Sequence, residues 1–220
     1  MNVVVIGGTG TIGMAVVARL QRGHDVTIAS RHTPHARVDI TDPDSIRALF
    51  ESIPQPDAVV CAAGAVVFKP FDELRDEDYA FGAANKLMGQ ANIVRMGHRY
   101  LSEGGSFTLT SGKLGRQPTS GTCSIALINS GIEGFVRAAA VELPRGIRVN
   151  AVSPEWTKES LALYGMDPSF GVPVATVAEA YVLAIEGSMT GTVIDVGWRY
   201  DAEHDYVAAD ELPVLAAVLS

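Results

Sequence analysis

Three glycines spaced three residues apart, Gly7, Gly10 and Gly13, are the first residues whose pattern suggests chemistry, in the segment GGTGTIG. They follow a buried-strand pattern at 3–6 and precede a helical pattern at 11–22. Glycines let a backbone approach a pyrophosphate, and a helix N-terminus favours its negative charge. A plain glycine turn is the alternative, but its position between the first strand and the first helix favours phosphate binding. The expected site also includes Thr9, Thr11 and Ile12.

The second predicted strand, at 26–29, ends in the residues IASRH. A carboxylate at this point would bond the ribose 2′-hydroxyl of NAD, but the chain has Ser30 and Arg31 there. A hydroxyl beside a guanidinium suits a 2′-phosphate, so we expect NADP(H) as the cofactor. A solvated surface arginine is the alternative. His32 and His35 have no metal-ligand partners in view, and no metal site is expected.

Strand and helix patterns alternate along the whole chain. The expected strands are 3–6, 26–29, 58–61, 106–110, 147–152 and 192–196. The expected helices are 11–22, 43–50, 74–101 (either continuous or interrupted), 125–143 and 177–186. This alternation predicts an α/β fold, a doubly wound parallel sheet with helices on both faces. We expect one domain at 1–200 that includes a substrate loop at 153–176. The tail at 201–220 is either a partner-contacting helix or a loosely ordered end.

Composition narrows the possible partners. The 220 residues include 47% hydrophobic and 19% charged side chains, and the net charge is −8. Because nucleic-acid binding relies on clustered basic charge, this balance argues against it. No uninterrupted apolar stretch approaches the ~18 residues of a membrane span. With two cysteines and no signal-peptide pattern, a reduced cytoplasmic location and a small-molecule substrate are expected.

Several motifs together resemble the short-chain dehydrogenase/reductase family, over residues 1–197. They are GGTGTIG, VDITD, CAAG, GGSFTLTSG, ELPRGIRVNAVSPEW and TGTVIDVG. The resemblance implies a Rossmann-type domain with a seven-stranded parallel sheet in the order 3-2-1-4-5-6-7. It implies that Asp39 and Ile40 hold the adenine. It places Ala62, Ala63 and Gly64 along the ribose and nicotinamide, and Pro154 and Thr157 in the nicotinamide loop.

The same resemblance exposes a departure at the catalytic centre. Family members carry Tyr-x-x-x-Lys on the helix after the serine strand, where the tyrosine exchanges a proton and the lysine lowers its pKa. Alignment of NSGIEGF puts Ile125 in the tyrosine position and Asn129 in the lysine position. Ile125 has no proton to give, and Asn129 is uncharged but can still bond a ribose hydroxyl. No tyrosine lies between Tyr100 and Tyr164, so a shifted alignment does not restore the pair.

Other polar groups are candidates for the missing chemistry. Ser111 matches the catalytic serine and is a candidate donor to a substrate oxygen. The family's asparagine on the preceding helix aligns with NKLMGQ, where either Asn85 or Lys86 takes its position; Lys86 would return a cation to the site. Two further reactive side chains are expected to be inert, Lys113 as a solvated loop lysine and Cys123 as a buried thiol.

The loop at 153–176 and the helix at 125–143 bear on substrate and assembly. Ile125, Trp156 and Tyr164 are expected to contact the substrate, and Tyr164 is a remote candidate for the missing phenol. The helix is the surface through which relatives form dimers or tetramers, so we expect a homodimer or homotetramer. The leading hypothesis is an NADP(H)-dependent oxidoreductase with a non-standard proton donor. A non-redox cyclase, isomerase or dehydratase and a non-catalytic nucleotide- or partner-binding protein are the alternatives.

Overall fold

A computed structural model describes residues 1–197 as one parallel sheet covered by helices on both faces. The strands are β1 (Asn2–Ile6), β2 (Asp25–Ala29), β3 (Ala58–Cys61), β4 (Ser106–Thr110), β5 (Arg148–Pro154) and β6 (Val193–Val196). The α-helices are α1 (Thr11–Leu20), α2 (Pro43–Ser52), α3 (Asp76–Gly82), α4 (Met88–Gly97), α5 (Cys123–Glu142), α6 (Lys158–Leu163) and α7 (Val174–Glu186). All strand pairs are parallel, which confirms the predicted α/β class.

Each face of the sheet has its own hydrophobic core. One cluster joins β1 and β3 to α1 and α7, through residues such as Val16, Leu20 and Tyr181. The other joins the opposite strand faces to α2, α4 and α5, through residues such as Phe50 and Ile132. Strands buried on both faces read as continuous apolar runs, which is why β1 and β3 could be recognised from the sequence.

The sheet has six strands in the described part of the chain, not seven. Its order is β2-β1-β3-β4-β5-β6, so the missing strand is the one expected at the edge beyond β2. At that edge the chain forms a single parallel bridge between Ser30 and Arg37. Pro34 lies within the returning segment and has no N–H to donate to a ladder, which limits pairing there.

The long helix expected at 74–101 is interrupted where the candidate residues lie. A π-helical turn, η2 (Ala83–Leu87), separates α3 from α4 and carries both Asn85 and Lys86. Turns of this kind are rare and frequently occur at functional sites. The tail expected at 201–220 lies outside the described residues.

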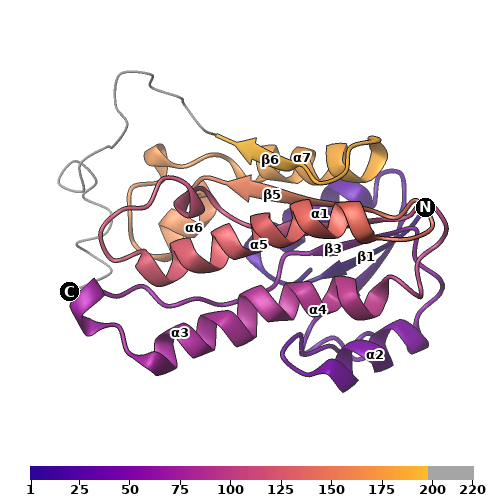
Figure 1. Cartoon of the computed structure of the whole chain (residues 1–220). Coiled ribbons are helices and arrows are strands. Elements are labelled where there is room, and N and C mark those ends of the chain that lie inside the picture. Colours follow the sequence, from indigo (N-terminus) through magenta and orange to yellow (C-terminus); the bar gives the residue numbers. More distant parts are fainter. Residues whose placement is uncertain (198–220) are drawn as a thin grey trace.

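α5 is long and apolar enough to cross a membrane by length and composition alone. In the structure it packs against β5 and carries buried residues such as Ile128 and Val136 in the domain core. Core helices of globular proteins meet the same criterion, so α5 is a core helix that covers one face of the sheet (Figure 1).

The tight packing of the β1–α1 turn gives a stability prediction. A Cβ added at Gly13 would lie 2.0 Å from the Gly7 carbonyl oxygen, which is backbone that has little room to move. Gly13→Ala should therefore lower the free energy of unfolding by roughly 1–3 kcal/mol, as overpacking does. Gly23→Ala is the matched control, because nothing lies within 4 Å of the added atom. Urea unfolding would measure both, and equal effects would contradict this account.

Candidate active site

The β1–α1 turn forms one wall of a cavity of about 350 Å³ at the carboxyl ends of β1, β2 and β3. Gly7 has a φ of +82°, and a Cβ there would lie 2.8 Å from the backbone of Ala62 and Ala63. The turn therefore requires glycine, and it leads into the N-terminus of α1. The lining includes most of the expected cofactor residues: Gly7, Thr9, Gly10, Ser30, Arg31, Asp39, Ile40, Ala62, Ala63 and Gly64. Gly13 is not among the residues that line the cavity, but it packs on Gly7 and so supports the turn.

Arg31 is the cation at the far end of this cavity. It is exposed, whereas the Ser30 hydroxyl is buried and bonded to the Thr33 hydroxyl at 2.8 Å and the His32 N–H at 3.2 Å. Asp39 accepts bonds from the hydroxyl and backbone N–H of Thr41, which hold the pKa of its carboxyl below the usual value; Arg31 adds to this shift. A free guanidinium and an anchored hydroxyl thus meet at the end of β2.

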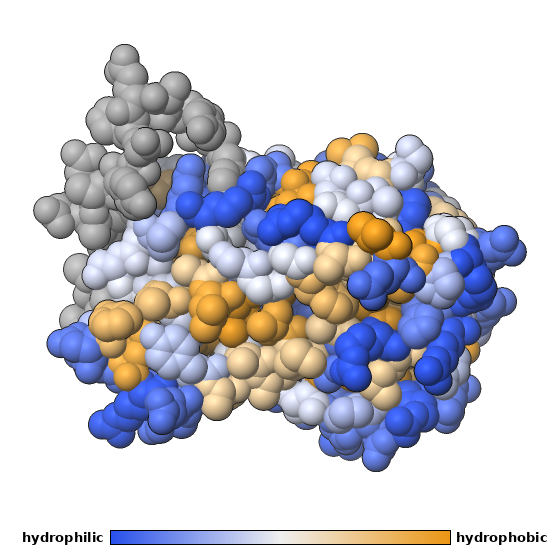
Figure 2. Space-filling view, viewed as in Figure 1, coloured by the Kyte–Doolittle hydropathy of each residue, from blue (hydrophilic) through white to orange (hydrophobic). Residues whose placement is uncertain are grey.

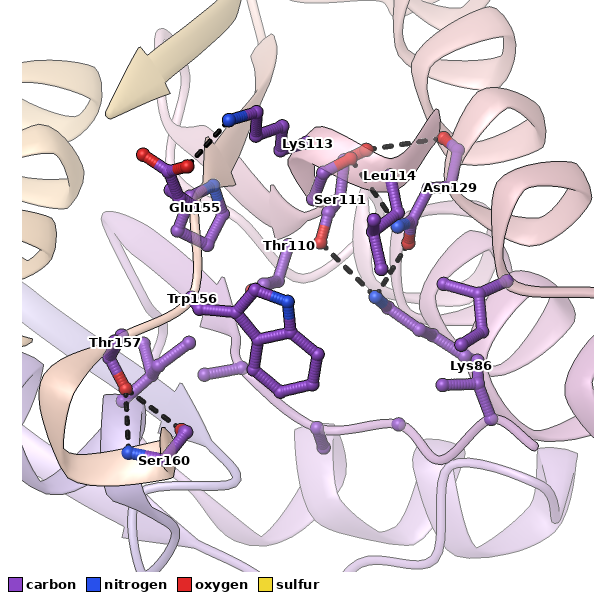
Figure 3. A pocket seen from close by; sticks show the side chains of 18 of the residues that line it. Lys86, Thr110, Ser111, Lys113, Leu114, Asn129, Glu155, Trp156, Thr157 and Ser160 are labelled. Atoms are coloured by element: carbon purple, nitrogen blue, oxygen red, sulfur yellow. Dashed lines mark hydrogen bonds and ion pairs between the residues drawn. The ribbon is translucent and has the colours of Figure 1, made fainter. Parts of the chain in front are cut away.

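A second cavity, of about 240 Å³, adjoins the first. Figure 3 shows the residues that line it. The two cavities share Ala62, Ala63 and Gly64, so a dinucleotide in one would extend toward the other. This substrate pocket, as we call it, is mostly apolar. Its lining includes Ile12, Val66, Phe68, Leu114, Ile125 and Trp156, with Lys86, Ser111, Lys113, Asn129, Glu155 and Thr157 as the main polar groups.

Lys86 is the candidate that the structure brings to the centre of this pocket. Its Nζ donates to the Asn129 Oδ1 at 2.7 Å and to the Ser111 carbonyl oxygen at 3.1 Å. Burial lowers the pKa of Lys86 to about 8. Asn85, its neighbour on η2, lines the first cavity instead, which we call the nucleotide cavity after its expected cofactor residues, and accepts the N–H of Ala65 at 2.8 Å. The two positions that the alignment left open therefore serve different cavities.

Ser111 lies at the pocket, but its hydroxyl is held by other partners. Its Oγ donates to the Glu133 carboxylate at 3.1 Å and to the Asn129 carbonyl oxygen at 3.2 Å. Glu133 is buried and is also paired with the Arg116 guanidinium at 3.2 Å. The backbone carbonyl of Ser111, rather than its hydroxyl, contacts Lys86. The sequence had not singled out Glu133, although a position four residues after Asn129 places it on the same helix face.

The substrate residues expected from the sequence separate into two groups. Ile125 is buried and lines the pocket together with Trp156, whose ring stacks on Phe68 at 5.6 Å between centroids. Tyr164 is exposed and packs edge-on against Trp156 outside the lining. Pro154 and Thr157 line the pocket, and the Thr157 hydroxyl caps α6 by accepting the Ser160 N–H.

Two expectations about reactive side chains were wrong. Lys113 is not a solvated loop lysine, because its amine forms an ion pair with Glu155 at the pocket and both side chains are largely buried. Cys123 is exposed rather than buried, because it lies at the first turn of α5 and points away from the core.

The described tyrosines do not supply a phenol at the pocket lining. The hydroxyl of Tyr181, a residue that the sequence analysis did not consider, is hydrogen-bonded to the hydroxyl of the lining residue Thr110 at 2.6 Å. That hydroxyl itself donates to the Cys61 carbonyl oxygen. Burial raises the pKa of Tyr181, which is opposite to what an acid at neutral pH needs. Tyr181 therefore packs in the core between α7 and the sheet.

Within residues 1–197, His, Cys, Asp and Glu form no group of three that could bind a metal.

Comparisons with known proteins agree with this geometry. A family model described as Enoyl-(Acyl carrier protein) reductase matches residues 11–170. The short-chain dehydrogenase/reductase ATR9 of Stachybotrys chlorohalonatus is 26% identical over 240 residues, covering 88% of this chain and 94% of that protein. The crystal structure of the protein lin1944 from Listeria innocua has a TM-score of 0.85 and 40% identity, covering 89% of this chain and 99% of that one. A small-chain dehydrogenase in complex with NADPH has a TM-score of 0.80 and 34% identity, covering 89% and 96%.

The contacts of Ser111 predict an effect on stability. Ser111→Ala removes a donor from the buried Glu133 carboxylate while keeping the backbone carbonyl that holds Lys86. It should lower the free energy of unfolding by roughly 1–2 kcal/mol, because a buried acceptor loses a partner. Ser130→Ala, which removes an exposed hydroxyl bonded to the Gly115 carbonyl, should cost less than ~0.5 kcal/mol. If urea unfolding gives Ser111→Ala no larger effect than this control, the Glu133 contact is not the role of that hydroxyl.

Proposed function

The chain belongs to the short-chain dehydrogenase/reductase family, and on this premise we propose that it is an NADP(H)-dependent oxidoreductase for a small organic substrate. The observation that carries the proposal is the junction of two cavities at Ala62, Ala63 and Gly64. One cavity has the shape and donors of a dinucleotide site, and the other is a small, largely apolar pocket. Such a junction places the reactive end of a cofactor against a substrate.

The residues present fit a nicotinamide dinucleotide. Backbone N–H groups at the start of α1 and the glycines of the turn suit a pyrophosphate, and an added Cβ at Gly7 would clash with the β3 exit. Asp39 and Ile40 would bound the adenine, and Pro154 and Thr157 would bound the nicotinamide side of the pocket. When bound, the reduced cofactor supplies a hydride to the substrate.

Arg31 supports NADP(H) over NAD(H). Its exposed guanidinium lies at the cavity end where the ribose of the adenosine half would lie, and no acidic side chain takes the place of Ser30 at the end of β2. The related small-chain dehydrogenase is described in complex with NADPH, which agrees with this choice.

We also propose a homodimer or homotetramer in the cytoplasm. Figure 2 shows apolar side chains gathered on the side of the molecule formed by α4 and α5. The exposed apolar residues of these elements include Met88, Leu127 and Val141. Both cysteines of the chain are free thiols, as is usual in a reducing compartment.

The cofactor assignment gives a binding prediction. Arg31→Ala should weaken NADPH binding roughly 10- to 100-fold, the range expected for loss of a charged hydrogen bond to phosphate. NADH binding should change less than about threefold, because NADH lacks that phosphate. Calorimetry of the wild type and the variant with both nucleotides would measure this.

Arg22→Ala is the matched control, since it removes an exposed arginine outside both cavities. Equal losses for NADPH and NADH in Arg31→Ala would contradict the 2′-phosphate assignment. A wild-type protein that binds neither nucleotide would contradict the proposed function itself.

A further inference from the structure

Two fixed acceptors hold the Lys86 amine. One is the Ser111 backbone carbonyl, and the other is the Asn129 amide oxygen. The Asn129 amide is itself oriented, because its Nδ2 donates to the Gly112 carbonyl oxygen at 3.3 Å. Asn129 therefore presents its oxygen, and not its nitrogen, to Lys86. Figure 3 shows the Lys86 amine between Ser111 and Asn129, with a dashed line to each.

This arrangement satisfies the amine in both of its protonation states. A neutral amine has two N–H bonds and one lone pair, and an ammonium has three N–H bonds. Two N–H bonds are directed to Ser111 and Asn129 in either case. The remaining tetrahedral position carries a proton in one state and a lone pair in the other. Because Lys86 lines the substrate pocket, a substrate oxygen there can reach this position.

Three other polar groups that line the pocket have partners of their own. The Ser111 hydroxyl donates to Glu133, the Thr110 hydroxyl donates to the Cys61 carbonyl, and the Lys113 amine is paired with Glu155. Ile125 fills the wall with an apolar side chain and is almost fully buried. Of the two amines that line the pocket, Lys113 is paired with a carboxylate, whereas Lys86 is held by two neutral acceptors and keeps one position for a substrate.

We propose that Lys86 is the catalytic acid of this protein, that Asn129 and the Ser111 carbonyl position its amine, and that the substrate is a carbonyl compound. The inference rests on the proposed oxidoreductase function. A carbonyl fits because its oxygen accepts a hydrogen bond in the ground state and must gain a proton as the alcohol forms.

Reduction of a carbonyl at this site takes two electrons from the cofactor and one proton from Lys86. A hydride adds its electron pair to the carbonyl carbon, and the C=O π pair moves onto the oxygen. The Lys86 ammonium gives one proton to that oxygen, so an O–H bond forms and an N–H bond breaks. The carbonyl is reduced to an alcohol, the cofactor is oxidised, and Lys86 is left as a neutral amine with both acceptors still satisfied. Solvent returns the proton before the next turnover.

The electrostatics of the pocket agree with this cycle. Burial brings the pKa of Lys86 to about 8, so both protonation states are populated near neutral pH. The titratable groups around it are Cys61 at the end of β3, Glu133 beyond Ser111, and the Lys113–Glu155 pair at the pocket. Burial raises the pKa of the Cys61 thiol to about 12, so Cys61 stays neutral over this range.

The kinetic test compares three variants with the wild type, using NADPH and a panel of aldehydes and ketones. Lys86→Met should lower kcat roughly 10²- to 10⁴-fold, the usual contribution of a general acid. Lys86→Arg should lose a similar factor, because a guanidinium keeps the charge but does not release its proton. Lys158→Met, which removes an exposed lysine at the start of α6, should keep wild-type activity.

Carbonyl reduction by the wild type should fall as the pH rises through about 8, because the ammonium is the active form. Retention of carbonyl reduction in Lys86→Met would overturn the inference. So would wild-type activity in Lys86→Arg, because charge alone would then be sufficient. NADPH binding without reduction of any carbonyl by the wild type would overturn the proposed function and, with it, the inference.

A second readout needs no cofactor and no turnover. Since the folded-state pKa of Lys86 is depressed, the unfolded chain binds more protons at this site between about pH 8 and the pKa of an ordinary lysine. The urea midpoint of the wild type relative to Lys86→Met should therefore rise with pH in that window. A constant difference would show that the amine titrates normally, and would overturn the role of Lys86 as an acid near neutral pH.

The contact also predicts coupling between its partners. Asn129→Lys alone should destabilise the protein, because it brings a second ammonium within hydrogen-bond distance of the first. Lys86→Asn combined with Asn129→Lys restores one amine and one amide, so the double variant should be more stable than the sum of the two single effects. Additive effects in urea unfolding would contradict the direct contact.

Discussion

The close approach of backbone to backbone at the β1–α1 turn is the constraint on which the rest of the site depends. Gly13 packs on Gly7, and Gly7 packs on Ala62 and Ala63 at the end of β3, with no space for a Cβ at either glycine. This contact brings the start of α1 against the exit of β3. The residues that follow β3 then form the boundary between the nucleotide cavity and the substrate pocket. A looser turn would separate the two cavities.

The polar side chains at the substrate pocket form one hydrogen-bonded network around Asn129. Ile125 adds apolar surface, and Asn129 accepts from Lys86 instead of carrying a charge of its own. The amine belongs to Lys86, which lies on η2 and not on α5. Buried polar groups are costly unless they are bonded, and here Ser111, Asn129, Glu133 and Lys86 satisfy one another. These four side chains therefore find their hydrogen-bond partners within the pocket wall itself.

Much of the fold could be predicted from the sequence because its signals are local. Apolar runs marked the buried strands, and the glycine spacing marked the turn before α1. The expectation of a seventh strand at the edge beyond β2 was wrong. The chain forms only a single bridge there, between Ser30 and Arg37, and this pairing depends on tertiary placement rather than on residue pattern. Lys113 and Cys123 were misjudged for a similar reason. Glu155 comes from a distant loop, and a single residue carries no periodicity that would show which side of α5 it faces.

The position of each residue along the π-helical turn η2 decides which cavity its side chain lines. Adjacent residues of a helical turn point in different directions, so the side chains of Asn85 and Lys86 on η2 face different surroundings. Asn85 and Lys86 use that difference to face two cavities. Loss or gain of one residue in this helix would rotate its chemistry relative to the sheet and exchange which cavity receives the amine. Relatives with the same fold and the same glycine turn can therefore diverge in reactivity through one insertion or deletion, with no change to the core.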